Sequence, residues 1–364
     1  MSVLLRKNEI EHLVRLAGTA PSGGNVQPWK VVAHASALEM YVHPTRGSGL
    51  LDVGHYASIF SLGSFLENLS LASAQLGLAH EVKIHPFEGL LKPVVTVSYW
   101  ERQSPPAAED PLYAAILQRH TNRRPHTGEP LPEARIQDLR ASIRELPFVG
   151  LSAFSERARK QRAASILGKT DALRMRHSSL FPEMMSELRW DAEEARRSAD
   201  GIALSTLELP AGAVSFLRAL RRYPRLRYLV PRPLFEKMSA PLVMSCSHLC
   251  SLVLRGDLST EKLVLAGRAS QRIWLAACSL GLAVQPMTVL PFLLIRAREF
   301  GGEGLSLATK HRVLLLGKAL QELFAVEQNE FPLFVFRLSR ASAASDRSLR
   351  LPPATLYELA EAPL

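Results

Sequence analysis

The sequence predicts an α+β protein in which one sheet-and-helix body occurs twice. Three observations support this class: helical and strand-like patterns alternate along the chain, a proline-rich segment divides them, and one helical pattern recurs. With 364 residues, the chain is long for one compact domain, since domains usually hold roughly 100–200 residues. A hydrophobic fraction of 47% with 21% charged residues excludes extended disorder.

The first part of the chain ends at the segment Glu101–Pro111 (ERQSPPAAEDP), whose prolines make it a poor interior for a helix or strand. We therefore expect two modules, 1–104 and 105–364. In the first, hydrophobic periodicity predicts these elements: helices at Lys7–Ala17 and Val53–Leu76, and strands at Lys30–Ala33, Glu39–Val42, Val82–His85 and Val94–Tyr99.

The second part continues the alternation with longer helical stretches. The predicted elements are helices near Leu112–Gln118 and Glu133–Ile143, a strand at Phe148–Phe154, a mostly helical region to about Arg197, an irregular piece at Asp200–Gly212, a strand at Leu242–Ser245, a helix at Glu261–Leu280, strand-like Arg312–Leu316 and Leu333–Leu338, and an extended tail.

An internal repeat supports duplication. When Gly63–Ala79 is placed over Gly267–Ala283, an offset of 204 residues, seven positions are identical and both helices end in Leu-Gly-Leu. The glycine supplies the left-handed end of a helix before a strand. Chance similarity between Ala/Leu-rich helices is the alternative, but agreement of helix, glycine and following apolar residues favours duplication.

The net charge of +10 suggests an anionic ligand or surface, without choosing between a phosphate cofactor, nucleic acid and a membrane. The densest apolar helical stretch, Trp274–Val284, is too short to cross a bilayer, and the N-terminus lacks the apolar core of a signal peptide. We therefore expect a soluble cytoplasmic protein with no membrane partner. Cys246 and Cys250 with His248 could be imagined as a metal site, but their apolar surroundings favour core packing, so no metal is expected.

A basic stretch, Arg218–Lys237, interleaves arginines with Tyr223, Tyr228 and Phe235, a pattern that can stack bases and contact phosphates. Its prolines break any recognition helix, so nucleic-acid binding is disfavoured. The alternative is a solvated basic face near a site entrance that attracts an anionic substrate.

Two short segments carry the chemistry. In Ala20–Trp29 (APSGGNVQPW), a Gly-Gly turn lets the backbone approach a flat ligand, while Asn25 and Gln27 offer amide donors and acceptors. In Arg119–His126 (RHTNRRPH), an extended backbone before the proline would place Arg119, Thr121 and Arg123 on one face as a phosphate clamp. The alternatives are a surface loop and a solvated basic turn.

These two segments resemble motifs of the FMN-dependent nitroreductase family. Arg119–Arg123 is similar to that family's Arg-x-Ser/Thr-x-Arg/Lys phosphate motif, and Pro21–Trp29 to its Pro-Ser-x-x-Asn-x-Gln-Pro-Trp loop. Leu280–Thr288 resembles the Leu-Gly-Leu, strand and turn that lie against the flavin ring, and Arg347–Pro352 resembles the closing basic segment that reaches the phosphate. The resemblance covers most of both modules and weakens between about residues 169 and 259.

In typical members the phosphate motif precedes the loop and two chains pair. Here the loop comes first, and each half has kept the part that the other lost, as in the fused two-module Acg-type subgroup. The resemblance therefore implies a nitroreductase-like fold duplicated as a single-chain pseudo-dimer, monomeric or assembled further into homo-oligomers, with one FMN site. The implied site residues are Pro21, Ser22, Asn25 and Gln27 from the first module, and Arg119, Thr121, Arg123, Met287, Thr288, Arg347 and Arg350 from the second.

The resemblance further implies an NAD(P)H-dependent oxidoreductase that reduces nitroaromatics, quinones or other electron-poor small molecules. NADH or NADPH would be the reductant, and no catalytic side chain is required because the flavin carries the chemistry. An insertion at about 170–258 would hold a lid, Trp190–Pro210, with an Asp200-Gly201 turn, although an ordinary helix connection remains the alternative. A flavin-binding or sequestering protein with little turnover is the rival function.

Overall fold

The computed structural model of the chain describes residues 3–47, 49–104, 108–125 and 128–360. The predicted module boundary after residue 104 adjoins residues that are not described, and His126 is itself one of the residues that are not described. The helices are α1 (Lys7–Ala17), α2 (Tyr56–Gln75), α3 (Pro111–Ala115), α4 (Glu133–Ser142), α5 (Arg157–Arg176), α6 (Leu180–Glu187), α7 (Ala192–Ser198), α8 (Ala211–Arg222), α9 (Arg232–Glu236), α10 (Ala240–Met244), α11 (Thr260–Ser279), α12 (Val289–Glu299) and α13 (Leu307–Phe324). The strands are β1 (Trp29–Ala33), β2 (Ala37–Val42), β3 (Leu78–Ile84), β4 (Val95–Arg102), β5 (Val149–Phe154), β6 (Leu188–Arg189), β7 (Ile202–Ala203), β8 (His248–Arg255), β9 (Ala283–Pro286), β10 (Glu330–Ser339) and β11 (Tyr357–Leu359).

The predicted α+β class is confirmed, and two main sheets carry it. The first sheet has the order β11-β1-β2-β4-β3, and the second has the order β5-β8-β10-β9. Without β11, both are four-stranded and every neighbouring pair is antiparallel. The order β1-β2-β4-β3 therefore corresponds to β5-β8-β10-β9, with α2 and α11 in equivalent places before β3 and β9. The two halves of the chain share one topology.

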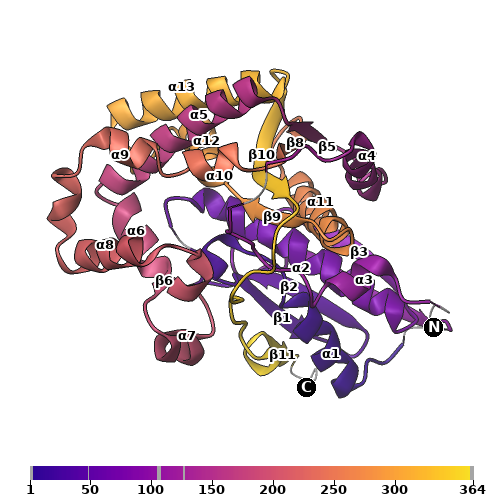
Figure 1. Ribbon diagram of the computed structural model, residues 1–364. Coiled ribbons are helices and arrows are strands. Elements are labelled where there is room, and N and C mark those ends of the chain that lie inside the picture. Colours follow the sequence, from indigo (N-terminus) through magenta and orange to yellow (C-terminus); the bar gives the residue numbers. More distant parts are fainter. Residues whose placement is uncertain (1–2, 48, 105–107, 126–127, 361–364) are drawn as a thin grey trace.

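The two long helices α2 and α11 cross between the sheets (Figure 1). At the crossing, a Cβ on Gly63 would lie 2.1 Å from the Val264 carbonyl oxygen, and a Cβ on Gly267 would lie 1.9 Å from the Phe60 carbonyl oxygen. Phe60 and Val264 are separated by the same 204 residues as the two glycines. The contact is therefore reciprocal, as at an interface related by a two-fold axis.

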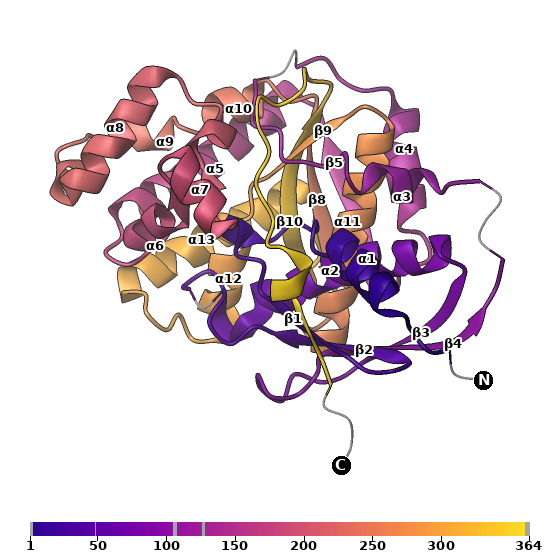
Figure 2. The same cartoon turned by 90° about the horizontal axis from the view of Figure 1, so that it is seen from below.

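The C-terminal segment joins the two halves. After β10 in the second sheet, the chain passes along the molecule and adds β11 to the first sheet, parallel to β1, with Val31 opposite Tyr357 (Figures 1 and 2). Residues 340–356 consequently run past the loop that precedes β1. This path brings the C-terminal arginines close to residues from the beginning of the chain.

The second half is longer because two of its connections contain helices. Helices α5 to α10 lie between β5 and β8, where the first half has a short turn between β1 and β2, and α12 and α13 lie between β9 and β10. Figure 1 shows α6 to α9 grouped beside the body of the molecule, away from both sheets. Part of this group, residues 188–210, reaches the first half.

Two strand predictions were wrong. Leu242–Ser245 lies in and just after α10, which begins with Pro241 near its first position, and the strand starts later at His248. Arg312–Leu316 lies inside α13. A short apolar run does not distinguish a strand from a buried helix, and the flanking apolar residues at helical spacing decide the outcome in α13.

Cys246 and Cys250 are free, buried thiols, and burial raises the pKa of Cys246 to about 11. Within the described residues, no group of three or more His, Cys, Asp or Glu side chains is placed to hold a metal ion. In the same part of the chain, no helix combines the length and apolar character needed to cross a bilayer.

Candidate functional site

A cavity of about 120 Å³ lies where the C-terminal segment meets the loop after α3. Five of the residues predicted from the motifs line it, and they come from two parts of the chain that are more than 200 positions apart in the sequence. The lining residues are Thr19, Ile116, Leu117, Arg119, His120, Thr121, Arg123, Thr206, Asp346, Arg347, Ser348 and Arg350.

Arg119 forms the inner wall of this cavity. Its side chain is buried, its guanidinium lies 4.6 Å from the centroid of the Trp274 ring, and Nη2 donates to the Thr19 carbonyl oxygen at 3.0 Å. Burial, together with the nearby guanidinium groups of Arg350 and Arg347, lowers the pKa of Arg119 to about 9. Burial therefore disfavours the positive charge of Arg119, and no carboxylate among the described residues forms an ion pair with it.

Arg350 and Arg347 reach the cavity from the C-terminal segment. Arg350 Nη2 donates to the same Thr19 oxygen at 3.3 Å, and burial lowers the pKa of Arg350 to about 10. Arg347 is more exposed, and its Nη1 donates to the Leu117 carbonyl oxygen at 3.0 Å. The closing basic segment thus supplies two guanidinium groups to one cavity, with Arg350 on its inner side.

Arg123 completes the cluster beside the segment predicted as a lid. Its Nη1 donates to the Thr206 carbonyl oxygen at 2.9 Å, and burial lowers its pKa to about 10 despite the nearby Glu208 carboxylate. Thr121 lines the cavity two residues earlier, as the expected alternation along an extended backbone requires.

These arginines share a deficit of negative charge. Within the described residues, Arg119, Arg123, Arg347 and Arg350 form no ion pair with a carboxylate, and the buried Nε atoms of Arg119 and Arg350 have no hydrogen-bond partner in this part of the chain. Burying charge without a counter-charge is costly. An anion with several oxygen acceptors would remove that cost, so the cavity is a candidate anion-binding pocket, although the Asp346 carboxylate also lines it.

The loop predicted from the first motif, Pro21–Trp29, lies next to this pocket, but its amide side chains contact the predicted lid and the C-terminal segment. Gly24, Asn25 and Gln27 have positive φ values of 59°, 56° and 52°, a turn held by the Ser22 hydroxyl, which accepts from the Gln27 backbone N–H at 2.9 Å. Pro21 and Ser22 are half-buried, whereas Asn25 and Gln27 are buried.

The two amide side chains of this loop bind backbone groups. Asn25 Nδ2 donates to the carbonyl oxygens of Gly201 at 2.9 Å and Leu349 at 3.0 Å. Gln27 Nε2 donates to the Ala199 carbonyl oxygen at 3.0 Å. The Gln27 Oε1 atom accepts from the Leu351 N–H at 2.9 Å. The loop therefore fastens both the predicted lid and the C-terminal segment. Among its own buried polar side-chain atoms, Asn25 Oδ1 and Trp29 Nε1 have no hydrogen-bond partner within the described residues.

The predicted lid, residues 190–210, is folded locally and fixed at its turn. β6 and β7 pair in parallel around α7, and Arg189 Nη2 lies 2.6 Å from Asp200 Oδ1. Gly201 has φ 69°, and a Cβ there would lie 2.8 Å from the Glu187 carbonyl oxygen, so the turn strongly favours glycine.

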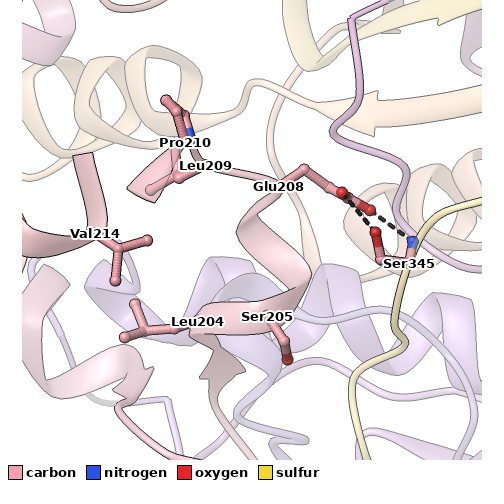
Figure 3. A pocket seen from close by; sticks show the side chains of 7 residues that line it. All are labelled: Leu204, Ser205, Glu208, Leu209, Pro210, Val214 and Ser345. Atoms are coloured by element: carbon pink, nitrogen blue, oxygen red, sulfur yellow. Dashed lines mark hydrogen bonds between the residues drawn. The ribbon is translucent and has the colours of Figure 1, made fainter. Parts of the chain in front are cut away.

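Further bonds hold the end of this segment over the arginines. Glu208 Oε1 accepts from the Ser345 N–H at 2.7 Å, and Glu208 Oε2 lies 3.3 Å from Arg124 Nε. The Ser205 hydroxyl donates to Asp346. Beside these contacts, a second, open hollow of about 590 Å³ lies between the end of the lid, the start of α8 and Ser345 (Figure 3). It is lined by Leu204, Ser205, Glu208, Leu209, Pro210, Val214 and Ser345.

The remaining predicted residues, Met287 and Thr288, lie between β9 and α12 and do not line the arginine cavity. The Met287 N–H donates to the Val335 carbonyl oxygen at 2.7 Å, so that group is already used. Both side chains are half-buried.

Arg337 is a residue that the motifs did not reveal. It is fully buried in β10, and its guanidinium donates to the Gln285 side chain at 2.5 Å and to the carbonyl oxygens of Arg124 at 2.7 Å and Asn122 at 3.4 Å. It therefore holds the backbone of the phosphate-like motif against the second sheet. The sequence signal that could have found it is an arginine in a largely apolar strand, EFPLFVFRLS.

No family model matches the sequence. The chain is 30% identical over 348 residues to the uncharacterized protein MT1398 of Mycobacterium tuberculosis (strain CDC 1551 / Oshkosh), a match that covers 93% of this chain and 47% of that protein. The chain thus spans about half the length of the curated relative it matches.

Several solved structures are similar at low identity. The FMN-dependent nitroreductase NfnB from Mycobacterium smegmatis, in complex with NADPH, gives a TM-score of 0.41 at 14% identity and covers 69% of this chain and 98% of its own. Nitroreductase A from Vibrio parahaemolyticus gives 0.39 at 13% identity, covering 71% and 78%. The NADPH:FMN oxidoreductase from Vibrio harveyi, complexed with NAD+, gives 0.38 at 12% identity, covering 70% and 80%.

Proposed function

We propose that the chain is an FMN-binding flavoprotein that transfers electrons from NADH or NADPH to electron-poor small molecules such as nitroaromatics or quinones. One observation carries the proposal: the two motif arginines, the motif threonine and both C-terminal arginines line one cavity, and none of these arginines forms an ion pair with a carboxylate in the part of the chain that the structure describes. An FMN phosphate would supply the missing negative charge and the acceptor oxygens.

The residues fit the phosphate end of the cofactor. Arg119, Arg123, Arg347 and Arg350 would bind its oxygens, with Thr121 as a short hydroxyl donor. The cavity of about 120 Å³ suits a phosphate group but is far smaller than the roughly 300–1,000 Å³ of sites for whole ligands. Binding of the complete nucleotide therefore requires the segment 190–210 to move away from the loop.

The site would belong to both halves of the chain. Arg119 and Arg350, from the second module, donate to the Thr19 carbonyl oxygen in the first. The reciprocal packing of Gly63 and Gly267 and the shared strand order support a single-chain pseudo-dimer with modules at 1–104 and 105–364. We expect one flavin per chain; size-exclusion chromatography with light scattering would separate a monomer from a further homo-oligomer.

Bound FMN would accept and donate a hydride at its N5 atom, and the protein would position it. Pro21, Ser22, Asn25 and Gln27 would lie at the ring end, where the amides now bonded to the lid become free when it moves. On the other side, the Met287 N–H is used within the fold, which leaves Thr288 as the proposed donor to the ring edge.

A sequestering function is the second candidate, and the closed lid favours it. Residues 199–208 hold Asn25, Gln27 and Arg123 with backbone oxygens, and Glu208 is bonded to Ser345 and Arg124. A lid fixed at so many points would retain a bound cofactor and exclude a nicotinamide.

Comparison of FMN with riboflavin, which lacks the phosphate, tests the site. Two charge-assisted contacts are worth about 3 kcal/mol together, so we expect FMN to bind about 100-fold more tightly than riboflavin. Arg119→Gln/Arg350→Gln should remove most of this preference without changing riboflavin binding, while Arg123 and Arg347 remain in the cavity. The matched control Arg15→Gln/Arg144→Gln, at exposed positions, should keep it. An FMN preference that is undiminished in the Arg119/Arg350 variant would refute the pocket.

Anaerobic reduction separates the two functions. Bleaching of the yellow holoprotein by NADH or NADPH, followed by reoxidation with menadione or a nitroarene, supports the reductase. A yellow protein that both nicotinamides leave oxidised supports sequestration. A colourless protein that does not bind FMN contradicts both.

A further inference from the structure

The basic stretch noted in the sequence forms a projecting arm, residues 211–238, which consists of α8, a short turn and α9. Figures 1 and 2 both show α8 and α9 at the outer edge of the molecule, away from the two sheets. The arm carries seven basic side chains, Arg218, Arg221, Arg222, Arg225, Arg227, Arg232 and Lys237, against the one acidic side chain of Glu236. It therefore accounts for more than half of the net charge of +10.

The inner side of the arm is an ordinary small core. Leu220 and Phe235 are buried against Met175 and Phe181 from α5 and α6. Arg227 is also held inside, with its guanidinium 4.4 Å from the centroid of the Phe181 ring. This packing fixes which side chains face outward.

The outer side is unusually apolar for an exposed surface. Leu229 is 78% exposed, Tyr223 59% and Leu234 57%, and Tyr228 and Met238 are nearly half exposed. Six of the 16 exposed large hydrophobic side chains among the described residues fall within positions 216–238. Single exposed leucines are normal, but such a concentration marks an interaction surface.

The charges beside these side chains are mostly free. Arg232 pairs with Glu236 at 2.8 Å, whereas Arg218, Arg222 and Arg225 form no ion pair within the described residues. The Arg222 guanidinium lies 5.5 Å from the centroid of the exposed Tyr223 ring. Basic and apolar groups are thus interleaved on one projecting element.

We propose that this arm docks the protein on the surface of an anionic lipid bilayer, with Leu229 and Leu234 among the headgroups and the free arginines at the lipid phosphates. Basic side chains beside exposed apolar ones are the composition that binds at such an interface. A second copy of the arm would repel the first, since both are strongly positive. Nucleic acid would match the charge but leave the aliphatic side chains without a partner. The proposal is independent of flavin binding. It concerns binding at the membrane surface, not a helix that spans the membrane.

Vesicle flotation of the 364-residue chain tests the proposal. We expect binding to phosphatidylcholine vesicles that contain phosphatidylglycerol, no binding to pure phosphatidylcholine, and weakening by salt. Each arginine near such a surface is worth about 1 kcal/mol, so Arg222→Gln/Arg225→Gln should lower the partition coefficient about 30-fold. Leu229→Ser/Leu234→Ser should also lower it, on the same vesicles.

Matched controls use exposed side chains elsewhere. Arg144→Gln/Arg312→Gln and Leu91→Ser/Leu307→Ser should leave the partition coefficient unchanged. Absence of binding to anionic vesicles at low salt would overturn the proposal, as would an equal loss in the controls. Tight oligonucleotide binding without vesicle binding would overturn the proposal and make nucleic acid the partner of the arm. A dimer that Leu229→Ser abolishes would overturn it too and make a second copy of the chain the partner.

Discussion

Gly63 on α2 and Gly267 on α11 face each other with their Cα atoms at the closest approach of the two long helices. The ideal Cβ of Gly63 would lie 2.8 Å from the Gly267 Cα, and that of Gly267 would lie 2.9 Å from the Gly63 Cα. The nearest obstacle on each side is a backbone carbonyl oxygen, which cannot rotate away as a side chain can. The two glycines therefore set the distance between the two halves of the chain.

We expect Gly63→Ala to lower the free energy of unfolding by about 2–4 kcal/mol, because the added methyl group forces the helices apart. Gly267→Ala should cost a similar amount, since the contact is reciprocal. Urea unfolding measures both. The control is Gly212→Ala in α8, where a Cβ has no neighbour within 4 Å; alanine there should be neutral or stabilise by up to about 1 kcal/mol. Equal effects at Gly63 and Gly212 would contradict the close approach.

The sequence predicted the local elements well where periodicity was long. The helix at Lys7–Ala17 is confirmed residue for residue, and the two long helices with their terminal glycines are confirmed within a few positions. The strand predictions at 242–245 and 312–316 were wrong because an apolar run of four or five residues does not define a hydrophobic period.

The site was predictable only in part, for a different reason. The resemblance placed Arg119, Arg123 and Arg350 at one site, but residue spacing alone did not, because their meeting depends on the path of residues 340–356 across both halves. Likewise, Asn25 and Gln27 bind Gly201 and Ala199, contacts between residues more than 170 positions apart. Such pairings follow from tertiary packing, and no local pattern specifies them.

Arg337 should act on the pocket through the backbone that it holds. Arg337→Gln removes the donors to the Asn122 and Arg124 carbonyl oxygens, so we expect a loss of about 2–4 kcal/mol in stability and about tenfold in FMN affinity. Riboflavin affinity should not change.

The control is Arg296→Gln. Arg296 is also buried and donates to the carbonyl oxygens of Leu50 and Glu303, but it does not line the cavity. It should lose similar stability and keep the FMN affinity of the unaltered protein. If both variants lose FMN affinity equally, the role of Arg337 is purely structural.

Inorganic phosphate should stabilise the protein without FMN. An anion that binds only the folded state adds about 2.7 kcal/mol at 100 times its Kd, and thermal unfolding at increasing phosphate concentration and constant ionic strength measures the shift in Tm. Arg119→Gln should remove most of the shift. In phosphate-free buffer this variant should lose little stability, because it also relieves repulsion from Arg350 and Arg347. An unchanged phosphate response in Arg119→Gln would contradict an anion pocket at this position.

Glu208→Gln should loosen the lid. The substitution weakens the contacts with Arg124 and with the Ser345 hydroxyl and N–H. We expect faster amide hydrogen exchange in residues 199–208 and release of bound FMN about tenfold faster. Glu193→Gln, at an exposed position on α7, is the control and should leave both unchanged. If release accelerates while NADPH still fails to reduce the flavin, lid closure is not what limits turnover.

Acid should destabilise the first module through Glu9. This buried carboxylate accepts from Arg102 Nη1 at 2.7 Å and from the Arg6 N–H at 2.8 Å, and these partners lower its pKa from 4.5 to about 2. Because the folded-state pKa is lower than the unfolded one, the stabilisation is fully present above about pH 4.5 and is lost as the pH falls towards 2. Solvent screening of the two arginines reduces the contribution to about 2 kcal/mol. Urea unfolding between pH 6 and 2.5 should therefore show a smaller acid loss in Glu9→Gln than in the unaltered protein. The exposed Glu11→Gln, on the same helix, should keep the full loss, and a matching reduction there would show that the acid sensitivity arises elsewhere.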